Sequence, residues 1–278
     1  MLKTIIQYKM MKIRQLIGFV ALVVTSAAFF ACQEKQELIF PEDTGGNVVI
    51  KVNGVSFKMI KVEGDVFRMG SDGYLFDVVE DETPTHNVLL STFYIAETEV
   101  TQELWNAVMI DNPSSQTGSD RLDFPVETVS WDDCQAFIDS LNAITGRKFS
   151  LPTEAQWEYA ARGGIKKNDY FFSGSDNATK VCWYSENSLA PREVKGKEAN
   201  KLGIYDMSGN VAEWCSDWYG PYYAAYQENP EGQATGTARV VRGGAWNSLE
   251  KECRNTARSS QAPEYKSSAI GFRLAMVD

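Results

Sequence analysis

The sequence predicts one domain that mixes short strands with a few capped helices, and three observations support this class. Apolar residues alternate with polar ones from Val48 to Met59, which is the period of a strand. Between residues 101 and 162, three segments carry apolar residues at helical spacing behind a Ser or Thr. From Gly164 to Lys201 the chain is rich in Gly, Asn and Ser, which indicates long loops. A hydrophobic content of 44% indicates a globular protein.

A two-residue hairpin turn is predicted at Asn53-Gly54, between two alternating runs. Both residue types accept the positive φ angles that such a turn needs. The first helix is predicted to start behind Thr101, which can cap it. Its apolar face consists of Leu104, Trp105, Val108 and Met109.

The second helix is predicted between Ser130 and Gly146, with Asp133 completing a capping box. The predicted buried stripe of this helix is Ala136, Phe137, Leu141 and Ile144. In the third helix, Thr153 caps the start and Gln156 reaches back to close a second capping box. Its buried face is Trp157, Ala160 and Ala161, and Gly163-Gly164 supply a left-handed exit.

Residues 1–31 have the pattern of a signal peptide. Basic residues precede an apolar run, Ile17 to Ala31, that is too short for an ordinary membrane span. Cys32 follows it and resembles the cysteine of a lipoprotein signal, which would carry diacylglycerol after cleavage. The alternative is an ordinary secretory signal cut nearby. We therefore expect a signal peptide (1–31), a tether (32–47) and a folded domain (48–278), anchored by lipid to the membrane of a bacterial cell envelope.

The mature chain is strongly acidic. The whole sequence has a net charge of −10, and removing the four basic and no acidic residues of 1–31 makes it −14. Nucleic acid is therefore not an expected partner, because phosphate contacts need Lys and Arg. An acidic surface is compatible with divalent cations.

Cysteine and histidine are sparse. Beyond Cys32, the four cysteines could form two bridges by any of three connectivities in an oxidising compartment: Cys134, Cys182, Cys215 and Cys253. The single histidine, His86, enters an apolar strand, where a structural role is favoured over that of a catalytic base. One histidine excludes a multi-histidine metal centre.

Residues 150–164, SLPTEAQWEYAARGG, resemble the signature of the formylglycine-generating-enzyme/sulfatase-modifying-factor family. Further segments match the family in the same order: FPVETVSW (124–131), LGIYDMSGNVAEW (202–214), RVVRGGAW (239–246) and IGFRL (270–274). The resemblance implies an α+β, C-type-lectin-like sulfatase-modifying-factor fold with little regular secondary structure and long loops. Gliding-motility-type lipoproteins of Bacteroidetes are similar to this combination of anchor and domain.

The resemblance also implies a calcium site. In the family, the motif at 209–213 holds Ca²⁺, which would fall here on the side chains of Asn210 and Glu213 and the carbonyls of Val211 and Ala212. The alternative is a turn, with Asn210 in a left-handed conformation and Glu213 paired with an arginine. A second family site would start at Asn187, but the acidic loop that completes it is missing here.

The family's copper site is incomplete in this sequence. Family oxidases hold copper between two cysteines five residues apart, and those positions are Ser248 and Cys253 here. A Ser hydroxyl is a poor Cu(I) ligand, so copper is not an expected cofactor. Cys253 would then be half of a bridge or a small buried residue. Related enzymes that use iron held by three histidines are excluded by the single histidine.

The sequence therefore predicts a module that binds or has a structural role, with no catalytic residues; its protein or glycan ligand is not identified. The alternative is a formylglycine-generating oxidoreductase that matures sulfatases by oxidising a cysteine. A set of arginines could suggest an anion site, but we expect them to pair with the excess carboxylates: Arg162, Arg242, Arg254, Arg258 and Arg273.

Overall fold

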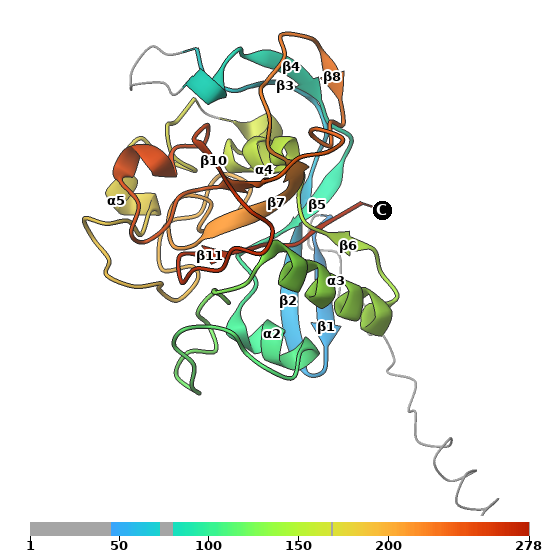
Figure 1. The fold of residues 1–278 in the computed structure, drawn as a ribbon, viewed down its shortest axis with the longest axis vertical. Coiled ribbons are helices and arrows are strands. Elements are labelled where there is room, and N and C mark those ends of the chain that lie inside the picture. Colours follow the sequence, from blue (N-terminus) through green and yellow to red (C-terminus); the bar gives the residue numbers. More distant parts are fainter. Residues whose placement is uncertain (1–45, 73–79, 168, 278) are drawn as a thin grey trace, which may run out of the picture. The chain divides into compact units, whose positions relative to one another are not determined.

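The computed structural model describes residues 46–72, 80–167 and 169–277. One sheet has five strands in the order β1-β2-β5-β12-β6 (Figure 1). These strands are β1 (Val48–Val52), β2 (Val55–Val62), β5 (Phe93–Ala96), β12 (Ala275–Met276) and β6 (Phe149–Ser150). The predicted hairpin is confirmed, because β1 and β2 pair antiparallel and Val52 lies opposite Val55. The turn residues have positive φ, 45° at Asn53 and 91° at Gly54.

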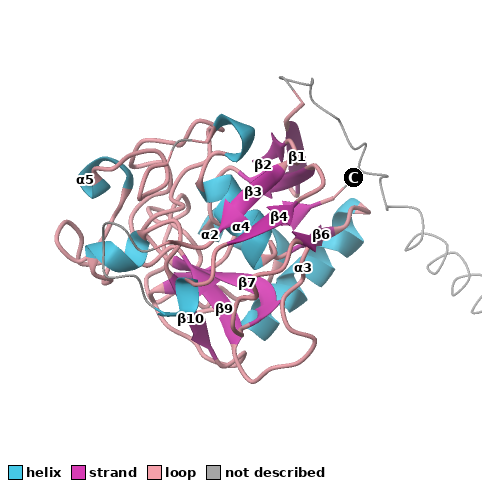
Figure 2. Ribbon diagram, turned by 90° about the horizontal axis from the view of Figure 1, so that it is seen from above, coloured by secondary structure: helices cyan, strands magenta, loops and turns pink. Residues whose placement is uncertain are grey.

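Two smaller sheets complete the strand content. One sheet has four strands in the order β10-β9-β7-β11, and the other has three strands in the order β3-β4-β8. The first contains β10 (Arg258–Gln261), β9 (Arg239–Arg242), β7 (Ala212–Trp218) and β11 (Ile270–Gly271). The second contains β3 (Val66–Met69), β4 (His86–Leu89) and β8 (Gln227–Glu228). Long loops join these strands, and helices are few (Figure 2). The α+β, C-type-lectin-like class with long loops is confirmed.

Three helices begin at the predicted capping residues: α2 (Gln102–Val108), α3 (Trp131–Thr145) and α4 (Glu154–Ala161). A short fourth helix, α5 (Ala178–Val181), lies in the segment that was expected to be loop. Thr101 caps α2, and capping boxes close the starts of α3 and α4 at Ser130 and Thr153. Short 3₁₀ turns occur at η1 (Glu80–Glu82), η2 (Gly164–Lys166) and η3 (Glu250–Cys253). Within the described residues, no helix is long and apolar enough to cross a membrane.

The prediction for the buried stripe of α3 was wrong in part. Phe137 and Leu141 are buried as expected, but Ala136 and Ile144 are exposed. The buried side of the helix instead consists of Cys134, Phe137, Ile138, Leu141 and Thr145. This rotation follows from the packing partner, because Phe137 stacks on Trp105 of α2 at 5.1 Å between ring centroids.

The apolar core has three separate parts. The largest lies among the five-stranded sheet, α2 and α3, and it includes Phe137 and Trp214. A second surrounds α4, whose Trp157 is completely buried. The third is a small cluster under the loop-rich part of the chain that carries α5, and it contains two cysteines.

Candidate functional site

The signature helix α4 carries charged side chains into the protein interior. Glu154, Glu158 and Arg162 are spaced four residues apart, so they lie along one face of the helix. Glu158 is fully buried and accepts hydrogen bonds from Arg162 Nε at 3.0 Å and from Arg242 Nη2 at 2.6 Å. Burial opposes ionisation of Glu158, yet Arg162 and Arg242 outweigh it and hold its pKa below the usual value. The signature is thus a structural device in this chain.

The other arginines are paired in the same way. Arg258 contacts both oxygens of Glu154, at 2.6 and 2.8 Å. Arg254 binds Glu82 of η1 through two bonds of 2.6 and 2.8 Å. This confirms the prediction that the arginines pair with carboxylates. These guanidinium groups already bind carboxylates of the protein, so they are not available to bind an anion.

The motif predicted to bind calcium forms a fully connected turn. Asn210 is buried with φ of 62°, its side-chain oxygen accepts the N–H of Arg192 at 2.9 Å, and its amide donates to Glu99 at 3.0 Å. Glu213 accepts two hydrogen bonds from Arg273, of 2.6 and 2.7 Å, and one from Trp157. Both features of the turn interpretation are therefore present.

The side-chain oxygens of Asn210 and Glu213 that calcium would need are thus bonded to protein donors. Val211 and Ala212 lie buried, in the loop before β7 and at its first residue. Asn187 is also used locally, because its side chain accepts from the N–H of Tyr184 and donates to the carbonyl of Cys182. Across the described parts of the chain, no three His, Cys, Asp or Glu side chains are placed to hold a metal ion. The arrangement does not fit a calcium ion without rearrangement, and calcium binding stays a prediction.

Two unpaired carboxylate oxygens lie beside this turn. Glu99 Oε2 and Asp206 Oδ1 are buried without a hydrogen-bond partner. Burial, followed by the charge of Asp206, raises the pKa of Glu99 well above its usual value. Burial raises the pKa of Asp206 to about 6. Asp206 therefore gains a proton as the pH falls through about 6, which reduces the repulsion between the two acids.

The two positions that would hold copper in a family oxidase differ in environment. Ser248 is half-buried, and its hydroxyl accepts the backbone N–H of Ala245 at 3.1 Å. Cys253 is completely buried at the end of η3. The free thiol of Cys182 lies in the same small buried cluster as Cys253. Sequence reasoning did not pair these cysteines.

Comparison with known proteins identifies the scaffold. The sulfatase-modifying factor enzyme 1-like domain matches residues 51–277. The chain belongs to this sulfatase-modifying factor family. A relative from Paenibacillus barcinonensis named chaperone protein LppX is 32% identical, over 82% of this chain and 89% of its own. A formylglycine-generating enzyme from Streptomyces coelicolor is 30% identical, over 78% of this chain and 88% of its own.

Family members also carry other names. A serine/threonine-protein kinase pkn1 of Chlamydia pneumoniae is 31% identical over 78% of this chain, which spans only 38% of the kinase. Among solved structures, Treponema denticola variable protein 1 has a TM-score of 0.76 at 32% identity, and the match covers 84% of this chain and 99% of that one. PvdO from Pseudomonas aeruginosa has a TM-score of 0.69 at 24% identity, which shows the fold alone. Membership in the sulfatase-modifying factor family therefore does not fix one activity.

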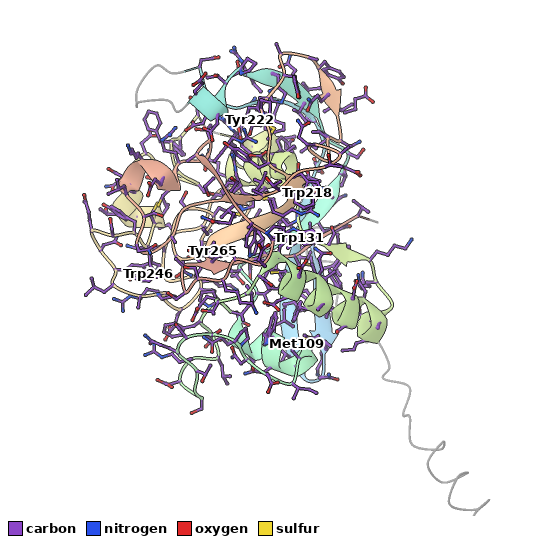
Figure 3. All side chains as sticks on the ribbon, viewed as in Figure 1. Met109, Trp131, Trp218, Tyr222, Trp246 and Tyr265 are labelled. Carbon is purple, nitrogen blue, oxygen red and sulfur yellow. The ribbon has the colours of Figure 1, made fainter. Side chains whose placement is uncertain are left out.

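A hollow of about 420 Å³ opens beside the start of α4. Its lining includes Tyr222, Trp218, Asp217 and His86. Figure 3 shows Tyr222 near β3 and β4, well separated from Trp246, the residue two positions before Ser248. His86 is buried, bonds to the carbonyl of Pro84 at 3.1 Å and packs edge-on to Tyr222, which confirms its structural role.

Asp217 is a buried acid in the lining of this hollow. It is 3% exposed and accepts the N–H of Glu154 and the hydroxyl of Ser216. Burial and then the neighbouring charge of Glu154 raise its pKa to about 7. Sequence reasoning missed this residue, because it is marked only by a contact between β7 and α4 and by no local motif.

The predicted lipidation site, Cys32, lies outside the described residues.

Proposed function

We propose that this chain is a lipid-anchored protein of the bacterial envelope whose sulfatase-modifying-factor domain binds a protein or glycan and does not oxidise a cysteine. The observation that carries the proposal is Ser248. Its oxygen stands where a family oxidase has a copper thiolate, and it serves a local turn through Ala245. A neutral hydroxyl is a poor Cu(I) ligand, so the family's copper pair is incomplete.

The burial of Cys253 supports the same proposal. Its side chain is 0% exposed, and so is that of Cys182. A peptide thiol that is to be oxidised must reach the reactive centre, and these two sulfur atoms offer it no open face. On this proposal, the ion pairs of α4 stabilise the family fold, and the oxidation reaction is absent.

The direct test is an oxidation assay. The purified protein, Cu(I), O₂ and a peptide with a Cys-x-Pro-x-Arg motif are incubated together, and the peptide mass is measured. We expect no change in mass, while the Streptomyces coelicolor relative serves as the positive control. Formylglycine produced by the unmutated chain would refute the proposal.

The second candidate function is the oxidation itself, and one observation favours it. Cys182 places a second sulfur atom beside Cys253, so the chain holds two thiols in one place even without a cysteine at position 248. If the assay yields formylglycine, Cys182→Ala must abolish it for this candidate to stand. Cys134→Ala is the matched control, since Cys134 is equally buried but belongs to another cluster.

The anchor is tested separately. If Cys32 is acylated, Cys32→Ala moves the protein from the membrane fraction to the soluble fraction of the envelope, as measured by immunoblotting after fractionation. Cys134→Ala should leave the distribution unchanged. Equal distributions of the Cys32 variant and the unmutated chain would remove the lipid anchor from the proposal.

A further inference from the structure

We infer that Cys182 and Cys253 form a disulfide that closes the small core beneath the loop-rich part of the domain. Both are free thiols in the structure, both are fully buried, and they belong to the same small apolar cluster. They come from segments 71 residues apart in the chain: Cys182 follows the one-turn helix α5, and Cys253 ends η3. Figure 1 shows these two short helices in the same corner of the domain.

The cluster around the pair is too small to hold this corner by burial alone. Its buried members are Phe172, Ala178, Val181, Cys182, Tyr184 and Cys253. The larger cores by contrast rest on sheets and long helices. Where a core is small, natural domains commonly add a covalent link. A disulfide would link the segment that carries α5 covalently to the segment that carries η3.

The surroundings of the other cysteines differ. Cys134 is packed in the core of α3, and Cys215 lies on β7 in the core around α4. Neither of these two clusters contains a second cysteine among its buried residues. The three connectivities open at the level of sequence therefore reduce to one bridge, with Cys134 and Cys215 remaining as thiols.

The reaction requires an oxidant, for which we take a disulfide such as oxidised glutathione or an envelope thiol oxidase. One thiolate attacks the oxidant disulfide to give a mixed disulfide, and the other thiolate displaces the second half. Each cysteine loses one hydrogen, a sulfur–sulfur bond forms, and the oxidant leaves as two thiols. Because both sulfur atoms are buried in the native fold, the bond forms while the chain folds.

The bridge would also fix the surface next to Ser248. The N–H of Ser185, three residues after Cys182, donates to the carbonyl of Ser248 at 3.0 Å. Cys253 is five residues beyond Ser248. The link therefore binds together the two segments that flank the former copper position, and it uses the sulfur atom that a family oxidase would give to the metal.

The cysteine pattern allows a direct test by mass spectrometry. Trypsin places each of the four cysteines in its own peptide: 122–147, 181–192, 202–239 and 252–254. The full chain is refolded in a glutathione redox buffer, its free thiols are alkylated under denaturing conditions, and it is digested without reduction. We expect peptides 181–192 and 252–254 joined, with a mass two hydrogens below their sum. Peptides 122–147 and 202–239 should be alkylated.

Recovery of 181–192 and 252–254 as alkylated peptides, or of any other linked pair, would overturn the inference. Thermal unfolding gives a second readout. Reductant should lower the midpoint of the unmutated chain by roughly 5 to 10 °C, since the bond closes a long loop. In Cys182→Ala and Cys253→Ala, reductant should have no effect, while Cys134→Ala should keep the full decrease. A reductant effect that survives in Cys182→Ala would also contradict the bridge.

Discussion

The helix α4 with its arginine partners and the cysteine corner under α5 represent two different ways of filling a protein interior. Around α4, Glu158 and Arg242 are both completely buried and bind each other at 2.6 Å. Under α5, the buried pair is Cys182 and Cys253, in a small apolar cluster. The first region resembles the family signature almost letter for letter, whereas the second has a serine, Ser248, where the resemblance places one of two copper ligands.

This difference has a physical reason. A buried ion pair tolerates little change, because removing one partner leaves a charge without solvent or counter-ion. The loss of a metal ligand leaves no such charge, since Ser248 is neutral, half-buried and bonded within its own turn. The fold can therefore be kept while the residues of a reactive site change, and the resemblance to the family indicates the fold.

The largest expected effect is at the centre of the ionic region. Arg242→Met removes one of the two arginine partners of Glu158 and one partner of Glu154, and it leaves an apolar side chain of similar length. We expect a loss of about 3–5 kcal/mol in the free energy of unfolding, measured by urea denaturation. The matched control is Lys58→Met, which breaks a partly exposed pair with Glu97 and should cost less than about 1 kcal/mol. Equal losses in the two variants would contradict the comparison.

A smaller effect is expected at Asp217, a buried acid to which no arginine of the described residues donates a hydrogen bond. Its pKa is raised to about 7, chiefly by burial, so the folded protein holds this proton more tightly than the unfolded chain does. The stabilisation is complete below the unfolded pKa of about 4 and is lost as pH rises through 7. Between pH 4 and 8, Asp217→Asn should therefore gain stability relative to the unmutated chain, on the order of 4 kcal/mol.

Urea denaturation of both proteins at a series of pH values measures this difference. Asp72→Asn is the control, because Asp72 is exposed and pairs with Arg68 at the surface. Its stability relative to the unmutated chain should hardly change over the same range. Parallel pH profiles for Asp217→Asn and the unmutated chain would show that the Asp217 carboxyl does not titrate near 7.

The elements that sequence predicts well are those whose causes lie within a few residues. The Asn53-Gly54 turn and the caps at Ser130 and Thr153 are each formed by neighbours in the chain. The position of the buried stripe on α3 depends on the sheet and on Trp105, so Ala136 and Ile144 were assigned wrongly. Local rules give the helix, and tertiary packing decides which side of it is buried.

The candidate site divides in the same way. Arg242 and Glu158 are 84 residues apart, and their pairing could be expected only in general terms from the charge balance. The neighbour of Cys253 is 71 residues away, and no spacing rule marks it. Two acids with raised pKa acquire their charged neighbours only on folding: Glu99 lies near Asp206, and Asp217 lies near Glu154.

The smallest expected effect is at Ser248, and this residue gives the strictest test of the comparison between the two regions. Its hydroxyl makes one bond, to the N–H of Ala245, and the side chain is half-buried. Ser248→Cys should therefore change the free energy of unfolding by less than about 1 kcal/mol, the net value of one such bond. The control is Ser173→Cys, because Ser173 is 4% exposed and its hydroxyl bonds both to the carbonyl of Ala161 and to Asn200. That variant should lose more, since two buried partners are left unsatisfied. If Ser248→Cys instead costs more than the control, the serine is a structural requirement of this corner, and its presence would then say nothing about the loss of copper chemistry.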